Sequence, residues 1–183
     1  MQIVLLCGGL GTRLSSIDSE NPKSMKLINN KPFLFYLLNS LNDYSFSSIH
    51  FCLGFKSEKI ISYIKKIQTN QNFTFSIENE DNLLGTGGAI KNSLEYLEDN
   101  FIIQYGDTIL RLNYHDLLKL HLISKKKMTM SIINSKLSNE IPNIYCEDIN
   151  KNQRKCIYSK ENPRSDANFI DYGAMVFKKS IFE

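Results

Sequence analysis

QIVLLCGGLGTRL, residues 2–14, runs from an apolar segment into a glycine-rich one. Residues 2–7 are rich in Ile, Val and Leu, which predicts a buried β-strand, and the glycines after them predict a loop. Three glycines lie within four positions: Gly8, Gly9 and Gly11. Because glycine has no side chain, the backbone there can turn sharply and bring its N–H groups close to a ligand. Arg13 adds a forked, permanent cation that suits phosphate oxygens, so the segment predicts a triphosphate-binding loop.

Two better-known glycine-rich loops do not fit this segment. The Walker loop ends in Gly-Lys-Ser/Thr, and no lysine follows Gly11 at that spacing. The dinucleotide fingerprint requires a third small residue where this chain has Leu14, and an acidic residue about 20 positions further on. Residues 29–31 are Asn-Asn-Lys instead. A purely structural turn after an edge strand is the remaining alternative.

Length and composition predict one globular domain, because 183 residues with 42% hydrophobic content can fill a sizeable core. A net charge of +3 is too small to favour nucleic acid binding. The chain lacks a run of about 18 apolar residues, so no membrane span or membrane partner is expected. The four cysteines form no C-x-x-C pair, which predicts reduced, buried thiols in a cytoplasmic protein.

Strand-like and helix-like segments alternate along most of the chain. Strands are expected at 2–7, 49–53, 73–77, 101–105, 128–133 and 169–177. Helices are expected to start near Asn30, Ser57, Thr86 and Asn113, with Asn30, Thr86 and Asn113 as their caps. This order predicts a Rossmann-like three-layer α/β/α fold with a mostly parallel central sheet. Residues 144–146 and 155–158 predict a hairpin, and with it a small β-rich portion near the C-terminus.

Three further places carry residues suited to polyphosphate chemistry. Lys23 directly follows Pro22 and is either a second phosphate-binding cation or a solvated lysine. Gly87-Gly88 falls in the first turn of a helix, where each glycine is unfavourable by about 1 kcal/mol, which indicates close approach by a ligand or by a neighbouring strand. Asp107 leaves the strand 101–105 through Gly106. Since ligands bind beyond the carboxyl ends of parallel strands, Asp107 is a candidate Mg²⁺ ligand, unless it only shapes its own turn.

Taken together, these motifs resemble those of the nucleotide-sugar pyrophosphorylases, also called sugar-1-phosphate nucleotidyltransferases. The matching stretches are GGLGTRL (8–14), PKSM (22–25), LGTGGA (84–89) and Gly106-Asp107, in the order and spacing of that family. The resemblance extends to about residue 178. LGTGGA looks most similar to the heptose-1-phosphate and mannose-1-phosphate guanylyltransferases.

The resemblance implies a role for each matched residue. Nucleotide-binding residues would be Gly8, Gly9, Gly11, Thr12, Arg13, Glu80, Gly85 and Gly88. Arg13 and Lys23 would be the catalytic cations, and Asp107 would bind Mg²⁺. The substrate-binding residues would be Gly106, Lys160 and Gly173, the last two in a sugar-binding portion near the C-terminus.

The implied reaction is in-line attack by a sugar 1-phosphate on the α-phosphorus of a nucleoside triphosphate, with release of pyrophosphate. Positioning and charge neutralisation suffice for such a step, and no covalent nucleophile is needed. Glu80 either accepts hydrogen bonds from the adjacent N–H groups of guanine, which favours GTP, or is a solvated glutamate in a loop. Homo-oligomerisation is left open.

The chain departs from the family pattern at several positions. Ser24 and Leu27 replace prolines, Ser159 replaces a glutamate before Lys160, and Asp171 stands where the family has asparagine. A second metal-binding aspartate normally lies beyond the end of this chain. Either the chain lacks its C-terminal end, or Asp171 compensates, or metal binding is weakened; we expect the single nucleotidyltransferase domain, 1–183, to lack its C-terminal end. Two alternatives remain: a non-catalytic nucleotide-binding regulatory domain, and a cytidylyl- or thymidylyltransferase with another phosphorylated acceptor.

Overall fold

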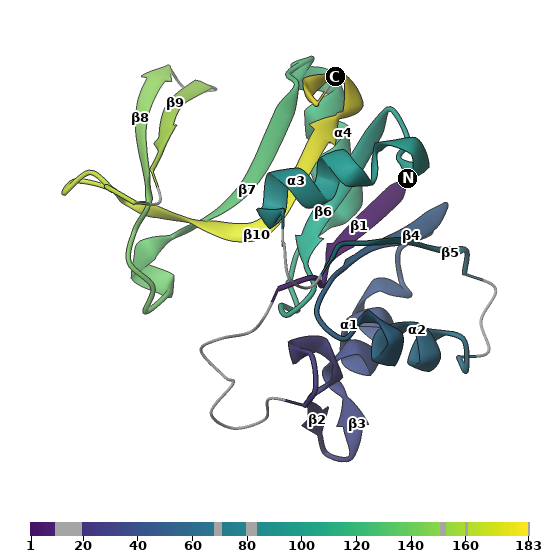
Figure 1. Ribbon diagram of the computed structural model, residues 1–183. Coiled ribbons are helices and arrows are strands. Elements are labelled where there is room, and N and C mark those ends of the chain that lie inside the picture. The colour runs from purple at the N-terminus through teal and green to yellow at the C-terminus, as the bar shows by residue number, and fades with distance from the viewer. Residues whose placement is uncertain (10–19, 68–70, 80–83, 151–152, 160, 183) are drawn as a thin grey trace. The chain divides into compact units, whose positions relative to one another are not determined.

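The computed structural model describes residues 1–9, 20–67, 71–79, 84–150, 153–159 and 161–182 (Figure 1). It divides into two compact units. The first unit comprises Met1–Thr129 and Met175–Glu183, and the second comprises Met130–Ala174.

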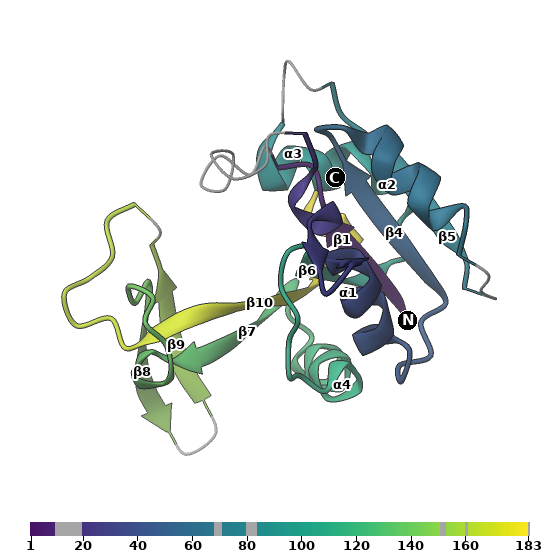
Figure 2. The same cartoon turned by 90° about the horizontal axis from the view of Figure 1, so that it is seen from below.

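The first unit is built on parallel strands. They are β1 (Gln2–Leu6), β4 (Ser48–Leu53), β5 (Phe73–Ile77) and β6 (Asn100–Tyr105), in the order β5-β4-β1-β6. Figure 2 shows β1 between β4 and β6. Every residue of β4 is buried, as expected for apolar strands covered on both faces. Leu6 pairs with Cys52 on one side and with Tyr105 on the other, so the carboxyl ends of β1, β4 and β6 meet at one edge.

Helices cover both faces of this sheet. The helices are α1 (Phe33–Leu41), α2 (Ser57–Ile64), α3 (Gly85–Asn92) and α4 (Tyr114–Ser124). Ile49 and Phe73 line a cavity together with residues of α1 and α2. The opposite face of the sheet packs on α3 in a core of Val4, Cys52, Ala89, Ile90, Leu97, Phe101 and Ile103. The predicted three-layer arrangement is therefore confirmed.

Two of the expected helix caps are wrong. Asn30 does not cap a helix: Asn29 and Asn30 have φ of 48° and 62° and form the turn between the short strands β2 (Leu27–Ile28) and β3 (Lys31–Pro32). Helix α1 begins after Pro32. Helix α3 begins at Gly85, one residue before Thr86, and no side chain of the described residues caps it. The expected cap at Asn113 is confirmed, since its Oδ1 accepts hydrogen bonds from two backbone N–H groups of α4.

Antiparallel pairing characterises the second unit. Strands β8 (Ile144–Asn150) and β9 (Gln153–Tyr158) form the predicted hairpin, and β10 (Phe169–Lys178) pairs with β8 and with β7 (Met128–Asn134). Cys146 lies opposite Cys156 in the hairpin and is joined to it by a disulfide, with Cα atoms 4.3 Å apart. The prediction that all four cysteines are reduced is wrong for this pair. Cys7 and Cys52 are free and buried, as predicted.

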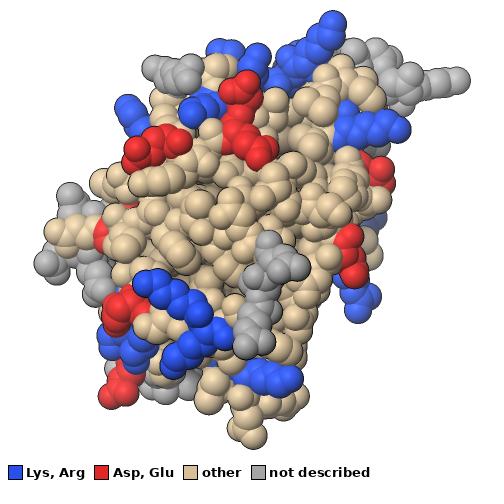
Figure 3. All heavy atoms as spheres, turned by 90° about the vertical axis from the view of Figure 1, so that its right-hand side faces the viewer, with Lys and Arg blue, Asp and Glu red and all other residues tan. Residues whose placement is uncertain are grey.

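Short 3₁₀ turns connect several elements. They are η2 (Lys23–Met25), η3 (Leu94–Tyr96), η4 (Ser135–Leu137) and η5 (Lys179–Ile181). Within the described ranges, no helix has the length and apolar character needed to cross a membrane. On the face shown in Figure 3, basic and acidic side chains are interspersed around a broad uncharged area rather than gathered into one basic surface.

Candidate active site

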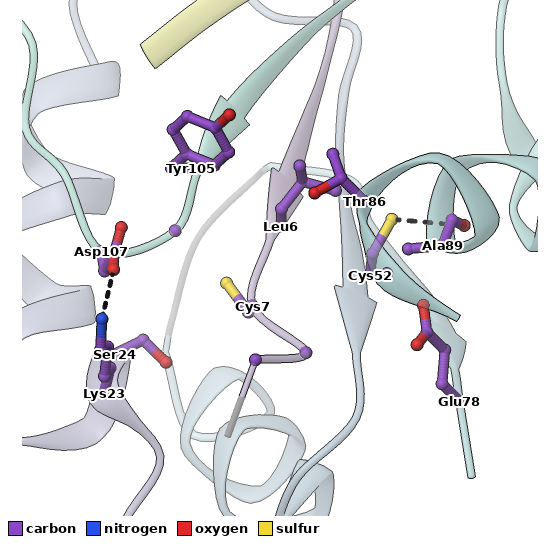
Figure 4. Close-up of a pocket in the computed structure, with 14 residues that line it drawn as sticks. Leu6, Cys7, Lys23, Ser24, Cys52, Glu78, Thr86, Ala89, Tyr105 and Asp107 are labelled. Atoms are coloured by element: carbon purple, nitrogen blue, oxygen red, sulfur yellow. Dashed lines mark hydrogen bonds and ion pairs between the residues drawn. The ribbon is translucent and has the colours of Figure 1, made fainter. Parts of the chain in front are cut away.

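A cavity of about 270 Å³ lies in the first unit, where β1, β4 and β6 end (Figure 4). Six of the predicted site residues line it: Gly8, Gly9, Lys23, Gly85, Gly106 and Asp107. The cavity therefore brings together the glycine-rich loop after β1, the turn η2, the start of α3 and the loop after β6. This is the carboxyl edge of a parallel sheet, at the point where the strand order reverses between β1 and β6.

Close backbone contacts fix the floor of the cavity. The N–H of Cys7 donates to the carbonyl of Cys52 at 2.8 Å, and the N–H of Gly106 donates to the carbonyl of Leu6 at 3.0 Å. A Cβ atom at Gly106 would overlap the Cys7 sulfur and lie 2.9 Å from the Leu6 oxygen. Glycine is required at position 106 by this packing, in addition to any role toward a ligand.

Lys23 and Asp107 meet at the cavity. Lys23 Nζ lies 3.0 Å from Asp107 Oδ2, although the two residues are 84 positions apart in the chain. Both side chains are partly exposed, so either group can exchange this partner for a ligand. An ammonium group suits a phosphate oxygen, and a carboxylate suits a hard cation such as Mg²⁺. The pair therefore places a phosphate-binding ammonium group and a cation-binding carboxylate side by side at the cavity.

Glu78 is a cavity residue that the sequence interpretation missed. It follows strand β5 directly and is only 8% exposed. Its Oε2 accepts a hydrogen bond of 3.0 Å from the N–H of Leu84, the residue before α3. The rule that pointed to Asp107, a carboxylate at the carboxyl end of a parallel strand, would have found Glu78 as well. Gly85 then begins α3 with φ of +70°, a conformation that glycine adopts without strain.

A buried polar network lies behind the cavity wall. Ser93 Oγ bonds the carbonyl of Ala89 at 2.8 Å, Cys52 Sγ at 3.2 Å and Ser76 Oγ at 2.6 Å. Ser76 in turn contacts His50 Nε2 at 3.2 Å. Burial lowers the pKa of His50 to about 4, so its imidazole is neutral at pH 7. This network connects α3, which lines the cavity, to strands β4 and β5.

The cavity thiols are unsuited to nucleophilic chemistry. Burial is the main factor raising the pKa of Cys7 and that of Cys52. Both groups therefore stay protonated at neutral pH, and a thiol is a far weaker nucleophile than a thiolate.

The remaining predicted residues lie elsewhere. Gly88 is in α3 but does not line the cavity, and a Cβ atom there would lie 2.5 Å from Leu84 Cβ. Gly173 lies in β10, in the second unit, and its N–H donates to Asp171 Oδ1 at 2.8 Å. Five predicted residues fall outside the described part of the chain: Gly11, Thr12, Arg13, Glu80 and Lys160. Among the described residues, no group of three or more His, Cys, Asp or Glu could hold a metal ion without further ligands.

Comparison with known proteins identifies close relatives. The D-glycero-alpha-D-manno-heptose 1-phosphate guanylyltransferase of Aneurinibacillus thermoaerophilus is 34% identical over 184 residues, which cover 100% of this chain and 77% of the relative. The enzyme of the same description from Campylobacter jejuni is 40% identical over 126 residues, or 69% of this chain and 55% of the relative.

Solved structures agree with the sequence relatives. A crystal structure of HddC from Yersinia pseudotuberculosis complexed with GMP-PN is 33% identical and superposes with a TM-score of 0.74, over 100% of this chain and 78% of that one. The family model described as nucleotidyl transferase matches residues 2–183. The predicted recognition and fold class are confirmed: this chain belongs to the nucleotidyl transferase family.

Proposed function

We propose that this protein is a sugar-1-phosphate guanylyltransferase, which joins GTP to a sugar 1-phosphate and releases pyrophosphate. The observation that carries the proposal is the meeting of Lys23 and Asp107, 3.0 Å apart, at a cavity lined by Gly8 and Gly9. Cation, carboxylate and bare backbone are the groups that polyphosphate transfer needs. The names of the sequence relatives support the choice of a guanylyl donor and a phosphorylated sugar.

In this proposal the chain's own residues position the reactants. The backbone N–H groups of Gly8 and Gly9 bind phosphate oxygens of the nucleotide, and Lys23 offsets negative charge near the α-phosphate. Arg13, which lies outside the described residues, is proposed to act on the same phosphates. The attacking oxygen belongs to the sugar phosphate itself, so no side chain has to form a bond to phosphorus.

The residues present fit a magnesium ion bound together with the substrate. Mg²⁺ is commonly held by one or two carboxylates, with phosphates and waters completing the octahedron. Asp107 supplies one such carboxylate at the cavity, and Thr108 Oγ1 donates to its Oδ1 at 3.2 Å. When bound, Mg²⁺ would neutralise phosphate charge that develops during transfer.

Glu78 is the residue that we propose to recognise the guanine base by hydrogen bonds. A carboxylate has about four lone-pair positions, and the Leu84 N–H occupies one of them. The others can accept the adjacent N–H donors on the pairing edge of guanine, whereas the matching edge of cytosine or uracil offers fewer donors. This proposal assigns to Glu78 the function that the sequence suggested for Glu80.

The proposed acceptor is a heptose or mannose type of sugar 1-phosphate. Relatives described as heptose 1-phosphate guanylyltransferases and as a putative mannose-1-phosphate guanyltransferase motivate this class. Gly106 remains a proposed substrate-binding residue at the cavity. On the strength of the family resemblance alone, Lys160 and Gly173 each remain proposed substrate-binding residues.

The proposal is tested by pyrophosphate release with Mg²⁺, each of the four nucleoside triphosphates and a panel of sugar 1-phosphates. We expect turnover with GTP and a manno-configured acceptor. Asp107→Asn should reduce turnover at least about 100-fold, as for loss of one group that stabilises a transition state. Asp43→Asn, at an exposed turn, is the matched control and should leave turnover unchanged. Absence of pyrophosphate release with every combination would refute the proposed activity.

A further inference from the structure

Ser24 carries an unexplained buried hydroxyl. Its side chain is only 3% exposed, and it lines the candidate active site next to Lys23. Among the described residues, Ser24 Oγ is the one buried side-chain nitrogen or oxygen without a hydrogen-bond partner. Buried hydroxyls almost always have partners, because an unsatisfied polar group is unfavourable away from water.

The backbone around Ser24 is held in place. Met25 N–H donates to the Pro22 carbonyl at 2.8 Å, and Lys26 N–H donates to the Lys23 carbonyl at 3.2 Å. These bonds close the turn η2 and direct the Ser24 hydroxyl toward Cys7 and the loop after β1 (Figure 4). The hydroxyl thus lies on the side of η2 that faces Cys7, at the cavity (Figure 4).

The neighbouring thiol of Cys7 does not account for this hydroxyl. No hydrogen bond of normal geometry joins the two groups, although the nearby Ser24 hydroxyl acts to lower the pKa of Cys7. Burial raises the pKa of Cys7 far more, so Cys7 remains a neutral thiol and only a weak acceptor. Among the described residues, no other acceptor forms a hydrogen bond with Ser24 Oγ.

We propose that the Ser24 hydroxyl donates a hydrogen bond to a phosphate oxygen of the bound nucleotide, beside the Lys23 ammonium group. This inference rests on the proposed function. A hydroxyl has a directed O–H bond, whereas an ammonium group acts mainly as a point charge. Ser24 would therefore fix the orientation of a phosphate whose charge Lys23 offsets.

The test compares Ser24→Ala with the unchanged protein by calorimetric titration with GTP and Mg²⁺, and with guanosine. We expect the Kd for GTP to rise about tenfold in Ser24→Ala and that for guanosine to stay the same, because only GTP carries the phosphates. The thermal midpoint of ligand-free Ser24→Ala should equal or exceed that of the unchanged protein, since the substitution removes an unsatisfied group.

Ser48→Ala is the matched control. Ser48 is also buried, at 7% exposure, but its Oγ accepts a hydrogen bond of 3.0 Å from Gln2 Nε2. It begins β4, at the edge of the sheet opposite the cavity. Ser48→Ala should lower the thermal midpoint and leave the Kd for GTP unchanged.

Each outcome decides between the proposals. If Ser24→Ala binds GTP as tightly as the unchanged protein, the inference is wrong and the proposed function stands. If Ser24→Ala lowers the thermal midpoint and Cys7→Ala does the same with no specific loss of GTP affinity, the hydroxyl is a structural partner of the thiol and the inference is wrong. If the unchanged protein binds no nucleoside triphosphate, the proposed function fails, and the inference with it.

Discussion

At the scale of single residues, Lys23 and Asp107 form an ion pair with each other in the absence of a ligand. Their ion pair is partly exposed at both ends, and such pairs contribute about 1 kcal/mol or less to stability. The pair can therefore open at little cost when phosphate or a cation binds. Until then, each group reduces the affinity of the other for its own ligand.

Replacing Lys23 by Gln should show whether the Lys23 ammonium group competes with a metal ion for the Asp107 carboxylate. With the ammonium group gone, Asp107 no longer pairs with a cation, so we expect weak Mn²⁺ binding in the absence of nucleotide to tighten about two- to fivefold. Electron paramagnetic resonance titration of free Mn²⁺ measures this directly. Lys26→Gln, one residue beyond the turn η2, is the matched control. Equal Mn²⁺ affinity in Lys23→Gln and the unchanged protein would contradict the competition.

Glu78→Gln should weaken recognition of guanine while the protein keeps its fold. The Gln carbonyl can still accept from the Leu84 N–H, but its NH₂ group then faces donors of guanine. We expect the Kd for GTP to rise about tenfold or more, with little change for UTP, by calorimetric titration. Glu58→Gln, on an exposed position of α2, should change neither value. If Glu78→Gln keeps its preference for GTP, another residue reads the base.

The residues of the site differ in how far the sequence revealed them. Asp107 was predictable, because a glycine and an aspartate directly follow an apolar strand. The burial of Ser24 was not, since the sequence around it is polar and charged. The disulfide between Cys146 and Cys156 depends on the register of β8 and β9, which has an irregularity between Asp148 and Asn150 that no local pattern indicates.

At the scale of elements, the glycine after β6 is required by packing between two strands. Gly106→Ala would place a methyl group against the Cys7 sulfur and the Leu6 carbonyl. We expect a loss of about 1–3 kcal/mol in the free energy of unfolding, measured by urea titration. At Gly9, a Cβ atom would meet no atom of the described residues within 4 Å, so Gly9→Ala should change this free energy by less than about 0.5 kcal/mol. Equal stability of the two variants would show that the close approach at Gly106 is absent in solution.

Strands β4 and β5 share a pH-sensitive contact at His50. Its ring contacts Thr74 at 2.8 Å and Ser76 at 3.2 Å, and stacks on Tyr96 with ring centroids 5.4 Å apart. The folded pKa is about 4 against an ordinary 6.5, so the unfolded chain binds the proton more readily between these values. Stability is therefore lost as the pH falls from about 6.5 toward 4, by up to roughly 1.4 kcal/mol for each pH unit.

Urea unfolding at pH 7, 6 and 5 tests this contact. His50→Gln cannot be protonated, so its free energy of unfolding should fall less over this range than that of the unchanged protein. Identical pH dependence in the two proteins would mean that His50 is protonated as easily in the folded state as in the unfolded chain.

The periodicity of apolar residues predicted most helices and strands, and the wrong predictions concerned the residues that cap the helices. Asparagine is favoured both as a helix cap and in left-handed turns, so Asn30 alone could not distinguish the two. Asn29 and Asn30 form the left-handed turn between β2 and β3, and α1 begins at Phe33, three residues after Asn30. Thr86 was a plausible cap by type, but the Glu78 carboxylate, brought near by tertiary structure, bonds the backbone just before α3 instead.

At the scale of the whole molecule, alternation of strands and helices was enough to predict the fold class. Right-handed crossovers leave few arrangements for such a chain, and the order β5-β4-β1-β6 is one of them. That order brings the ends of β1 and β6 together, although the sequence separates them by about 100 residues. The hairpin predicted a small β-rich portion near the C-terminus, but the bounds of the second unit, Met130–Ala174, were not predictable, since strands β7 and β10 each have residues in both units.

The central claim is that GTP binds at the carboxyl edge of this sheet, and amide hydrogen exchange with and without GTP and Mg²⁺ tests it most directly. We predict slower exchange on ligand addition in four segments, 7–9, 23–25, 84–89 and 105–107, and no change in helix α1. Loss of this protection in Lys23→Gln would agree with the account. Protection confined to other parts of the chain, or no protection at saturating GTP, would contradict it.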